Sequence, residues 1–287
     1  MNILTVDVED YFHVSAFAKV IDRQAWGGLE CRVESNTQRL LDLFDKRAVK
    51  GTFFVLGWVA ERYPALVEEI ARRGHEVASH GWSHQLVYEQ APGVFREEAR
   101  RSKLLLEDIV QQPVRGYRAA SYSITKKSLW ALDILCELGF EYDSSIYPVY
   151  HDRYGIPDAV REPHRLTAPS GASIIELPLS YITMMGARIP ISGGGYFRLF
   201  PYWFTRKSIR TVNEDDGLPV IFYLHPWEVD PGQPRISASL VSRFRHYNNL
   251  EKCYGRLNAL LGDFQFSTAA DYVAGMGVGK SDEVAYG

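Results

Sequence analysis

The chain has 287 residues, and 46% of them are hydrophobic, which is enough for a substantial core in one large domain or two small ones. Its 32 Lys and Arg residues against 35 Asp and Glu residues give a formal charge of -3, so nucleic acid is not an expected partner. No run of about 18 apolar residues could form a membrane-spanning helix, and the N-terminus lacks a leader, so we expect a cytoplasmic protein without a transmembrane segment.

Short apolar runs alternate with longer amphipathic stretches over the first two-thirds of the chain, which is typical of an α/β protein. In chain order we expect a strand at residues 3–8, a helix at 36–46, a strand at 51–55, a helix at 64–73 and a strand at 75–79. There follow a helix at 93–110, strands at 114–117 and 140–142 around a helix at 126–138, a strand at 220–224, a helix at 237–261 and a closing strand at 264–267.

The stretch at residues 150–215 breaks this alternation. It is punctuated by Pro157, Pro163, Pro169, Pro178 and Pro190 and by the three glycines of GGGYFRLFPYW (193–203). We expect an elaborated loop region there, within a single domain of residues 1–275. The glycines permit a tight loop beneath several aromatic side chains, on the substrate side of the domain or in a structural hairpin. The small and polar residues 276–287 predict a disordered tail.

Polar side chains lie where several of the predicted strands end. Parallel strands joined by right-handed crossovers bring their carboxyl ends to one edge, and the loops of that edge carry the chemistry of such folds. We therefore expect these side chains to meet there. They are Asp7, Glu9 and Asp10 at the end of the first strand, His80 and His84 after the third, and Arg118, Asp143 and His225 after later ones.

The spacing of two of these histidines suggests a metal site. His80 and His84 are four residues apart in SHGWSH, which directs two imidazoles at one cation if the segment is helical. With a carboxylate from the first strand they would form a site with open positions, suited to Zn²⁺ and also to Co²⁺, Ni²⁺ or Mn²⁺. One acid would bind metal while another acts as a base, although each could instead cap a helix. The HxxxH pair alone is equally compatible with a chance arrangement in a loop.

His225 is suited to protonate a departing amine, because an imidazole titrates near neutrality, and Asp143 could hold its other nitrogen. Arg118 could offset the repulsion among the acids through a charge-assisted pair with the base. The structural alternatives are a strand-end histidine with satisfied hydrogen bonds and a surface ion pair. Nearby aromatic residues, among them Tyr122 and Trp227, have flat faces that suit sugar rings, although most large aromatics belong to the core.

Five sequence segments occur in the order found in one known family. They are TVDVEDYFHV, GHEVASHGWSH, GYRAASYS, YDSSIYP and FYLHPWE, and the match extends from residue 1 to about residue 275. On these segments the chain resembles the NodB-type polysaccharide deacetylases of carbohydrate esterase family 4, and within them the branch found with exopolysaccharide and exosortase gene clusters. The resemblance implies an α/β fold, a distorted (β/α)7-type barrel.

The resemblance also implies roles for the proton-transfer residues. Asp7 would be the general base, and Arg118 would steady it. His225 would be the general acid, and Asp143 would tune it.

The metal ligands implied by the resemblance are His80, His84 and one carboxylate. The family usually has two adjacent aspartates in its first segment, whereas here Val8 separates the base from the next acid, so Glu9 or Asp10 could be the ligand. Glu9 is favoured, because relatives with an Asp-x-Asp segment place the ligand two residues after the base.

The backbone near Ser121 and Tyr122 would donate a hydrogen bond to the oxyanion, although Ala120 stands where a proline is common, and Trp227 would lie beside the substrate. The implied function is a metal-dependent hydrolase that removes N-acetyl groups from amino sugars of a polysaccharide or its precursor. An N-acetylated glycan would be its partner, and a homo-oligomer is compatible with the sequence. The alternatives are an allantoinase-like hydrolase of a small cyclic or linear amide and a non-catalytic carbohydrate-binding relative.

Overall fold

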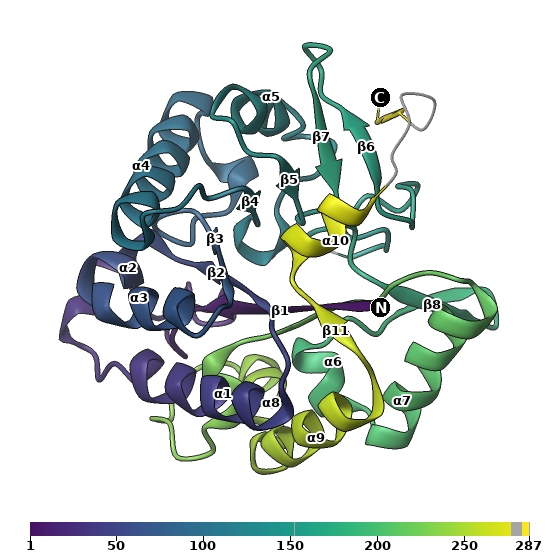
Figure 1. The fold of residues 1–287 in the computed structure, drawn as a ribbon. Coiled ribbons are helices and arrows are strands. Elements are labelled where there is room, and N and C mark those ends of the chain that lie inside the picture. The colour runs from purple at the N-terminus through teal and green to yellow at the C-terminus, as the bar shows by residue number, and fades with distance from the viewer. Residues whose placement is uncertain (152, 277–282, 287) are drawn as a thin grey trace.

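A computed structural model describes residues 1–151, 153–276 and 283–286 of the chain. Its centre is a curved sheet with helices packed around the outside (Figure 1). In the described part, seven neighbouring strands run parallel, in the order β10 (Ile221–Leu224), β1 (Asn2–Val8), β2 (Thr52–Val55), β3 (Glu76–Ser79), β4 (Gly116–Tyr117), β5 (Tyr142–Asp143) and β7 (Ser173–Glu176). This arrangement confirms the predicted distorted (β/α)7-type barrel.

The helices between these strands are amphipathic and cover the outer face of the sheet (Figure 1). They are α1 (Val33–Arg47), α2 (Gly57–Arg62), α3 (Pro64–Arg72), α4 (Pro92–Val110) and α5 (Trp130–Glu137). On α1, Leu40 and Phe44 are fully buried, and the ring of Phe44 packs against Phe53 of β2 with centroids 6.0 Å apart. After α3 the chain turns through Gly74 at φ 78°, a conformation that costs glycine little.

The region at residues 150–215 contains more regular structure than its prolines suggest. β7 belongs to the main sheet, and β6 (His164–Thr167) pairs with it antiparallel. β8 (Tyr181–Met184) and β9 (Ala187–Pro190) form a separate hairpin, followed by α6 (Gly194–Leu199) and α7 (Tyr202–Arg210). The expectation of a loop region was wrong for β6 and β7, because Pro163 and Pro178 lie just outside the strands, where they remove no ladder hydrogen bond.

The C-terminal part closes the fold beside β1. α8 (Leu240–Tyr247) and α9 (Leu250–Asp263) divide the predicted helix at Asn249, whose φ is 52°. β11 (Phe266–Ser267) pairs with the start of β1, and α10 (Ala269–Gly275) follows. Short 3-10 helices lie at Arg23–Gly28, Val87–Glu89, Ala120–Tyr122 and Pro226–Val229, and a π-helical turn at Thr211–Asp215.

The prediction of a disordered tail is wrong for the part of it that the structure describes. β12 (Glu283–Ala285) pairs parallel with β6, and the hydroxyl of Tyr286 contacts Nε2 of His164 at 2.9 Å. These hydrogen bonds hold the segment against the edge of the sheet. Residues 277–282 and 287 lie outside the described residues. Among the described helices, none has the length and apolar character needed to cross a membrane.

Candidate active site

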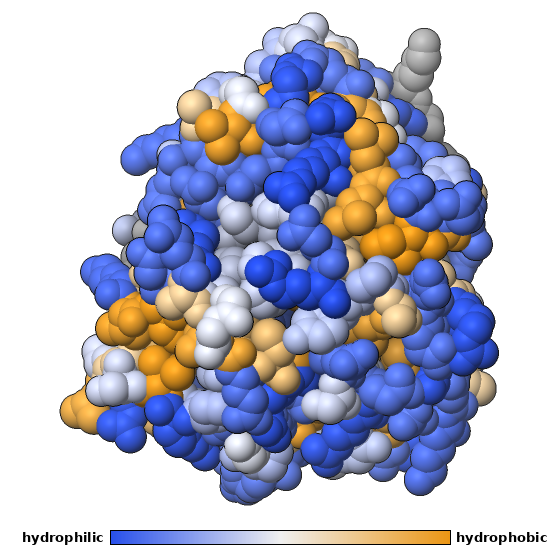
Figure 2. Space-filling view, turned by 90° about the vertical axis from the view of Figure 1, so that its left-hand side faces the viewer, coloured by the Kyte–Doolittle hydropathy of each residue, from blue (hydrophilic) through white to orange (hydrophobic). Residues whose placement is uncertain are grey.

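The carboxyl ends of the parallel strands face the left side of Figure 1, and Figure 2 looks onto that face, which is hollowed at its centre. Alternation along β1 places Thr5 and Asp7 on the same side of the sheet. Nη1 of Arg118 donates to Oδ1 of Asp7 and to Oγ1 of Thr5, both at 2.7 Å. Arg118 is fully buried, and its other guanidinium nitrogens donate to the carbonyl and the hydroxyl of Ser144. The structure thus brings the expected base and its arginine together in one fixed geometry.

Glu9, His80 and His84 converge just beyond Asp7. One ligand atom from each of these buried residues lies within 4.8 Å of the other two. Nε2 of His84 is 2.9 Å from Oε2 of Glu9, yet that oxygen has no hydrogen-bond partner among the described residues. Two imidazoles and one carboxylate, all buried and with their ligand atoms this close together, fit a divalent metal ion.

The protonation states of these residues also suit a metal. Nδ1 of His80 donates to the carbonyl oxygen of Arg118 at 2.8 Å, which leaves Nε2 as the ligand atom. Burial lowers the pKa of His80 to about 4, so its imidazole is neutral. Burial alone would raise the pKa of Glu9, but the charges of His84 and His225 outweigh it and hold that pKa well below its ordinary value. Glu9 is therefore a carboxylate.

The SHGWSH segment is not helical, so the expectation that a helix directs His80 and His84 at one cation was wrong. Gly81 and His84 both adopt left-handed backbone conformations, with φ 72° and 51°. A loop therefore folds the second histidine back towards the first. A positive φ at a non-glycine residue is strained and persists where the surroundings enforce it, as at many functional sites.

Asp10 does not lie with the candidate metal ligands. It caps a helix instead, which was the alternative role that the sequence allowed for these acids. Its Oδ2 accepts the backbone N–H groups of Arg32 and Val33 at 2.6 and 2.8 Å, at the start of α1, while its Oδ1 accepts the N–H of Tyr11. Burial raises the pKa of Asp10 to about 6 against the opposing effect of these hydrogen bonds. Glu9 is thus the acid that the structure places with the histidines.

His225 follows β10 and faces the acids. Its Nε2 lies 3.4 Å from Oε1 of Glu9 and 3.9 Å from Oδ2 of Asp7. Its Nδ1 donates to Oε1 of Glu228 at 2.8 Å, and Oε2 of Glu228 accepts from Nε of Arg198 at 2.5 Å. Burial disfavours the imidazolium, but the charges of Glu9, Glu228 and Asp7 outweigh it and raise the pKa of His225 to about 9.

The expectation that Asp143 holds His225 was therefore wrong, because Glu228 occupies that position. Asp143 ends β5, five strands away from β10 in the sheet order. It accepts from the hydroxyl of Ser145 at 2.6 Å and lies beside Glu176, whose Oε1 accepts the N–H of Ile146. Burial raises the pKa of both acids, that of Glu176 well above its ordinary value, so the pair holds a proton. Asp143 supports the turn from which Ser144 holds Arg118.

Ser121 and Tyr122 have consecutive positive φ angles, 50° and 55°, which marks this turn as strained. The backbone N–H of Tyr122 donates to the carbonyl oxygen of Ala119 at 3.0 Å, so the group expected to serve the oxyanion is engaged within the turn. In the described part of the chain, the hydroxyl of Tyr122 is buried without a hydrogen-bond partner. That hydroxyl, rather than the N–H, is the donor that this turn leaves available.

Trp227 is buried, so it is not the open platform for a sugar that its sequence position suggested. Its ring stacks on His225 at 5.2 Å and on His246 at 4.1 Å, and its indole N–H donates to Oε1 of Glu9 at 3.5 Å. Trp227 therefore helps to orient His225, the candidate acid, and Glu9, the candidate ligand.

A cavity of about 210 Å³ opens over this site. Asp7, Glu9, His80, His84 and His225 line it together with residues that the sequence did not indicate, among them Ser15, Tyr154, Tyr223 and Arg245. Glu228, which holds His225 but does not line the cavity, did carry a readable signal, because it lies three residues after His225 in HPWE. Ser15 and Tyr154 come from loops, whereas Tyr223 belongs to β10 and Arg245 to α8, and their approach to the site depends on the closed shape of the barrel.

Two family models together match most of the chain. Residues 25–142 match a family described as polysaccharide deacetylase, and residues 144–274 match one described as a domain of unknown function, DUF3473. The chain therefore carries a domain of the polysaccharide deacetylase family. The candidate ligands His80 and His84 lie in the first segment and the candidate acid His225 in the second.

The chain is 29% identical over 98 residues to peptidoglycan-N-acetylglucosamine deacetylase of Bacillus cereus, an alignment covering 34% of this chain and 36% of that protein. It thus spans about a third of the length of that relative. In fold it is similar to a candidate polysaccharide deacetylase from Mycobacterium smegmatis, with a TM-score of 0.58, 24% identity and coverage of 95% and 88% of the two chains. It is also similar to a CE4 family pseudoenzyme from Bacillus anthracis, with a TM-score of 0.50, 13% identity and coverage of 100% and 69%.

Proposed function

We propose that this protein is a metal-dependent N-deacetylase, which hydrolyses the acetamide of an amino sugar in a polysaccharide or its precursor. The observation that carries the proposal is the assembly around one cavity of a buried carboxylate, a three-residue ligand set and an imidazole. Amide hydrolysis needs these parts: a base for water, an electrophile for the carbonyl oxygen and an acid for the amine. The family match of residues 25–142 supports the same reaction.

A divalent cation held by Glu9, His80 and His84, for which we propose Zn²⁺, would polarise the acetamide oxygen and make a water molecule more acidic. Asp7 takes the proton from the attacking water, and Arg118 keeps the carboxylate oriented for that transfer. The hydroxyl of Tyr122 is suited to donate to the oxygen that becomes negative after attack. The proposed metal site has two histidines and one carboxylate, which leaves coordination positions open for water and substrate.

His225 completes the reaction. Its Nε2 gives a proton to the amine nitrogen as the carbon–nitrogen bond breaks, so that acetate and a free amino sugar result. Glu228 fixes the tautomer by accepting from Nδ1, and it stabilises the positively charged imidazole before proton transfer. Proton transfer by a positioned side chain contributes about 10² to 10⁴-fold to such rates.

We further propose that residues 1–275 act as a single domain. Support comes from the pairing of β10 with β1, which joins the two matched segments in one sheet. The candidate active site likewise takes residues from both segments, so we expect neither to be active without the other.

The proposal is tested by acetate release from a panel of N-acetylated glycans, with Zn²⁺, with other divalent ions and with chelator. We expect release from at least one glycan and its loss on chelation. Ring opening of a cyclic ureide by the same sample, without acetate release from any glycan, would instead assign the chain to the allantoinase-like hydrolases.

A non-catalytic role is the second candidate, because one fold neighbour is described as a pseudoenzyme. The complete set of base, ligands and acid favours an active enzyme over this alternative. Glycan binding that persists unchanged in a metal-stripped sample, with no acetate released by the metal-loaded one, would support the pseudoenzyme.

A further inference from the structure

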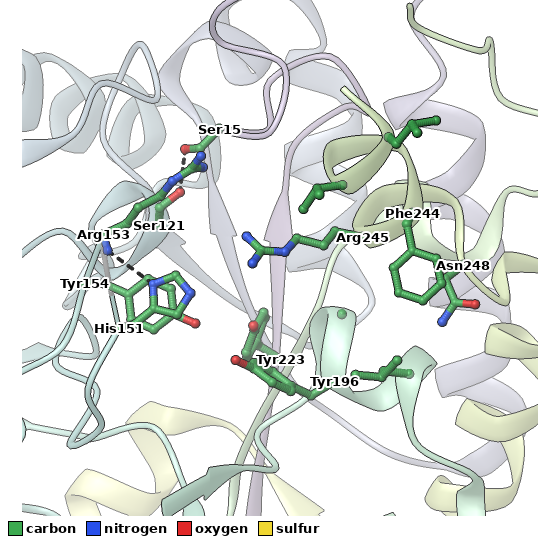
Figure 3. A pocket seen from close by; sticks show the side chains of 14 residues that line it. Ser15, Ser121, His151, Arg153, Tyr154, Tyr196, Tyr223, Phe244, Arg245 and Asn248 are labelled. Atoms are coloured by element: carbon green, nitrogen blue, oxygen red, sulfur yellow. Dashed lines mark hydrogen bonds between the residues drawn. The ribbon is translucent and has the colours of Figure 1, made fainter. Parts of the chain in front are cut away.

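A second and larger cavity of about 630 Å³, drawn in Figure 3, shares part of its lining with the cavity of the candidate active site. Ser15, Ser121, Tyr154, Tyr223 and Arg245 line both this cavity and the one around Asp7. A substrate whose acetamide lies at the metal ligands can therefore extend into the larger cavity without leaving the protein surface.

The far wall of this cavity is apolar and exposed. It is formed by one face of α8 and the end of α6, with Leu199, Leu240, Val241 and Phe244. Leu240 and Phe244 are 81% and 58% exposed. Leaving grouped apolar side chains in contact with water costs free energy, so an exposed patch of this kind is typical of a binding surface. Sugar rings stack on flat aromatic faces, whereas branched aliphatic side chains offer a surface that suits a hydrocarbon chain.

Two arginines line the larger cavity: Arg245 also lines the cavity of the acetamide site, and Arg153 lies across the larger cavity from Phe244. Arg245 reaches from α8 across the cavity towards the side that carries Arg153 and Tyr154 (Figure 3). Among the described residues, no carboxylate lies within ion-pair distance of either guanidinium. Arg245 lines both cavities, so an anion bound to it would lie between the sugar and the apolar wall. Guanidinium groups suit phosphate oxygens because their donors form a planar fork.

A third cavity beside the candidate site, which shares Ser15 and Arg153 with the larger one, has a more polar lining. This cavity of about 640 Å³ borders His84 and is lined by charged side chains that include Lys19, Asp22, Arg23 and Glu89. Such walls suit the hydroxyl groups of further sugars. Figure 2 shows several separate hydrophobic patches on this face, with hydrophilic side chains around them. The two cavities thus differ in character, because one has an apolar wall and the other a more polar lining.

We propose that the substrate is a lipid-linked glycan: an N-acetylated amino sugar joined through phosphate or diphosphate to a hydrocarbon chain. This inference rests on the proposed function and adds the nature of the carrier. The sugar lies at the metal ligands, the phosphate at Arg245 and Arg153, and the first part of the hydrocarbon against Leu240 and Phe244. An unmodified polysaccharide would leave the apolar wall uncovered.

The test compares acetate release from three substrates: an N-acetylglucosamine tetramer, the octyl glycoside of N-acetylglucosamine, and N-acetylglucosamine linked through diphosphate to a citronellyl chain. We expect kcat/KM for the diphosphate substrate to exceed that for the tetramer by about tenfold or more, the scale of burying one large apolar group. F244S should remove most of this preference and leave the activity on the tetramer unchanged. L104S is the matched control, because Leu104 of α4 is 51% exposed and lies outside this cavity.

The arginine is tested in the same way. R245Q should lower kcat/KM for the diphosphate substrate by more than for the uncharged octyl glycoside, whereas R243Q on the same helix should affect neither. Equal activity on all three substrates, or F244S and L104S variants that behave alike, would overturn the inference while the proposed function stands. F244S that keeps the preference but loses binding to anionic lipid vesicles would also overturn it and assign the wall to a membrane surface. Absence of acetate from every substrate with metal present would instead refute the proposed function.

Discussion

Nδ1 of His225 lies 2.8 Å from Oε1 of Glu228, and the two residues are separated by a single turn of 3-10 helix. The same carboxylate oxygen accepts the backbone N–H of His225, and Arg198 holds the other oxygen. A buried carboxylate in this position fixes the tautomer of the imidazole and favours its charged form. The candidate acid is thus controlled from its own loop and not from β5.

E228Q should therefore weaken the acid without removing it. The amide cannot stabilise the imidazolium as a carboxylate does, so the pKa of His225 falls and less of it is protonated at neutral pH. We expect kcat to fall on the order of 10²-fold and the alkaline limb of the pH–rate profile to move to lower pH. The pH dependence of kcat measures this directly.

D143N is the matched comparison, because Asp143 was the residue expected to tune His225. Asp143 lies in the proton-holding pair with Glu176, so its replacement should leave the alkaline limb where it is. If the alkaline limb of the pH–rate profile moved in D143N and stayed in place in E228Q, Asp143 and not Glu228 would be the partner of His225.

Replacing Glu9 should weaken metal binding, whereas replacing Asp10 should not. E9Q removes one of three ligands and should cost Zn²⁺ affinity by at least about 10²-fold, whereas D10N should bind Zn²⁺ as the wild type does. D10N should instead lower the free energy of unfolding by about 1 kcal/mol, because Asn caps the start of α1 less completely. Metal titration and denaturant unfolding of both variants check the assignment, and loss of metal in D10N with retention in E9Q would reverse it.

Stability should decrease as the pH falls below neutrality. Burial lowers the pKa of His13, His75 and His246 from 6.5 to about 3, 4 and 3, so these side chains stay neutral in the folded protein. The unfolded chain takes up their protons below pH 6.5, whereas the folded chain does so only near pH 4 and below. The free energy of unfolding therefore falls with pH in this window, by up to about 1.4 kcal/mol per pH unit for each histidine.

His75 offers a way to isolate one of these contributions. Its Nδ1 accepts the N–H of Gly51 at 3.2 Å, and a glutamine oxygen could replace that acceptor. H75Q should reduce the slope of unfolding free energy against pH between 6.5 and 5 by up to about 1.4 kcal/mol per unit. Denaturant titrations at several pH values measure the slope, and identical slopes for both proteins would contradict the prediction.

Much of the site could be predicted from the sequence, because the apolar runs show where the buried strands end. Asp7, Glu9, His80, Arg118 and His225 each lie at or just after an apolar run, and parallel strands bring such positions to one edge. The family resemblance supplied their roles. The identity of the ligand acid was left open between neighbours and needed the direction of each side chain.

The remainder depended on contacts that no local pattern encodes. Asp143 was assigned to His225, although the curvature of the sheet places it with Glu176 instead. The conformation of SHGWSH rests on two left-handed residues, and helical spacing gives no sign of them. The apolar wall on α8 could not be distinguished from a core-facing stripe, because periodicity shows that a face is apolar but not what covers it.

Asp7 tests the central claim most directly, since the account makes it the base and not a ligand. The measurement is the Zn²⁺ content of D7N together with its acetate release from the best glycan substrate. We predict wild-type metal stoichiometry and no release above background, because Glu9, His80 and His84 remain in place while no group takes the proton from water. Full turnover by D7N, or loss of its metal, would contradict the assignment.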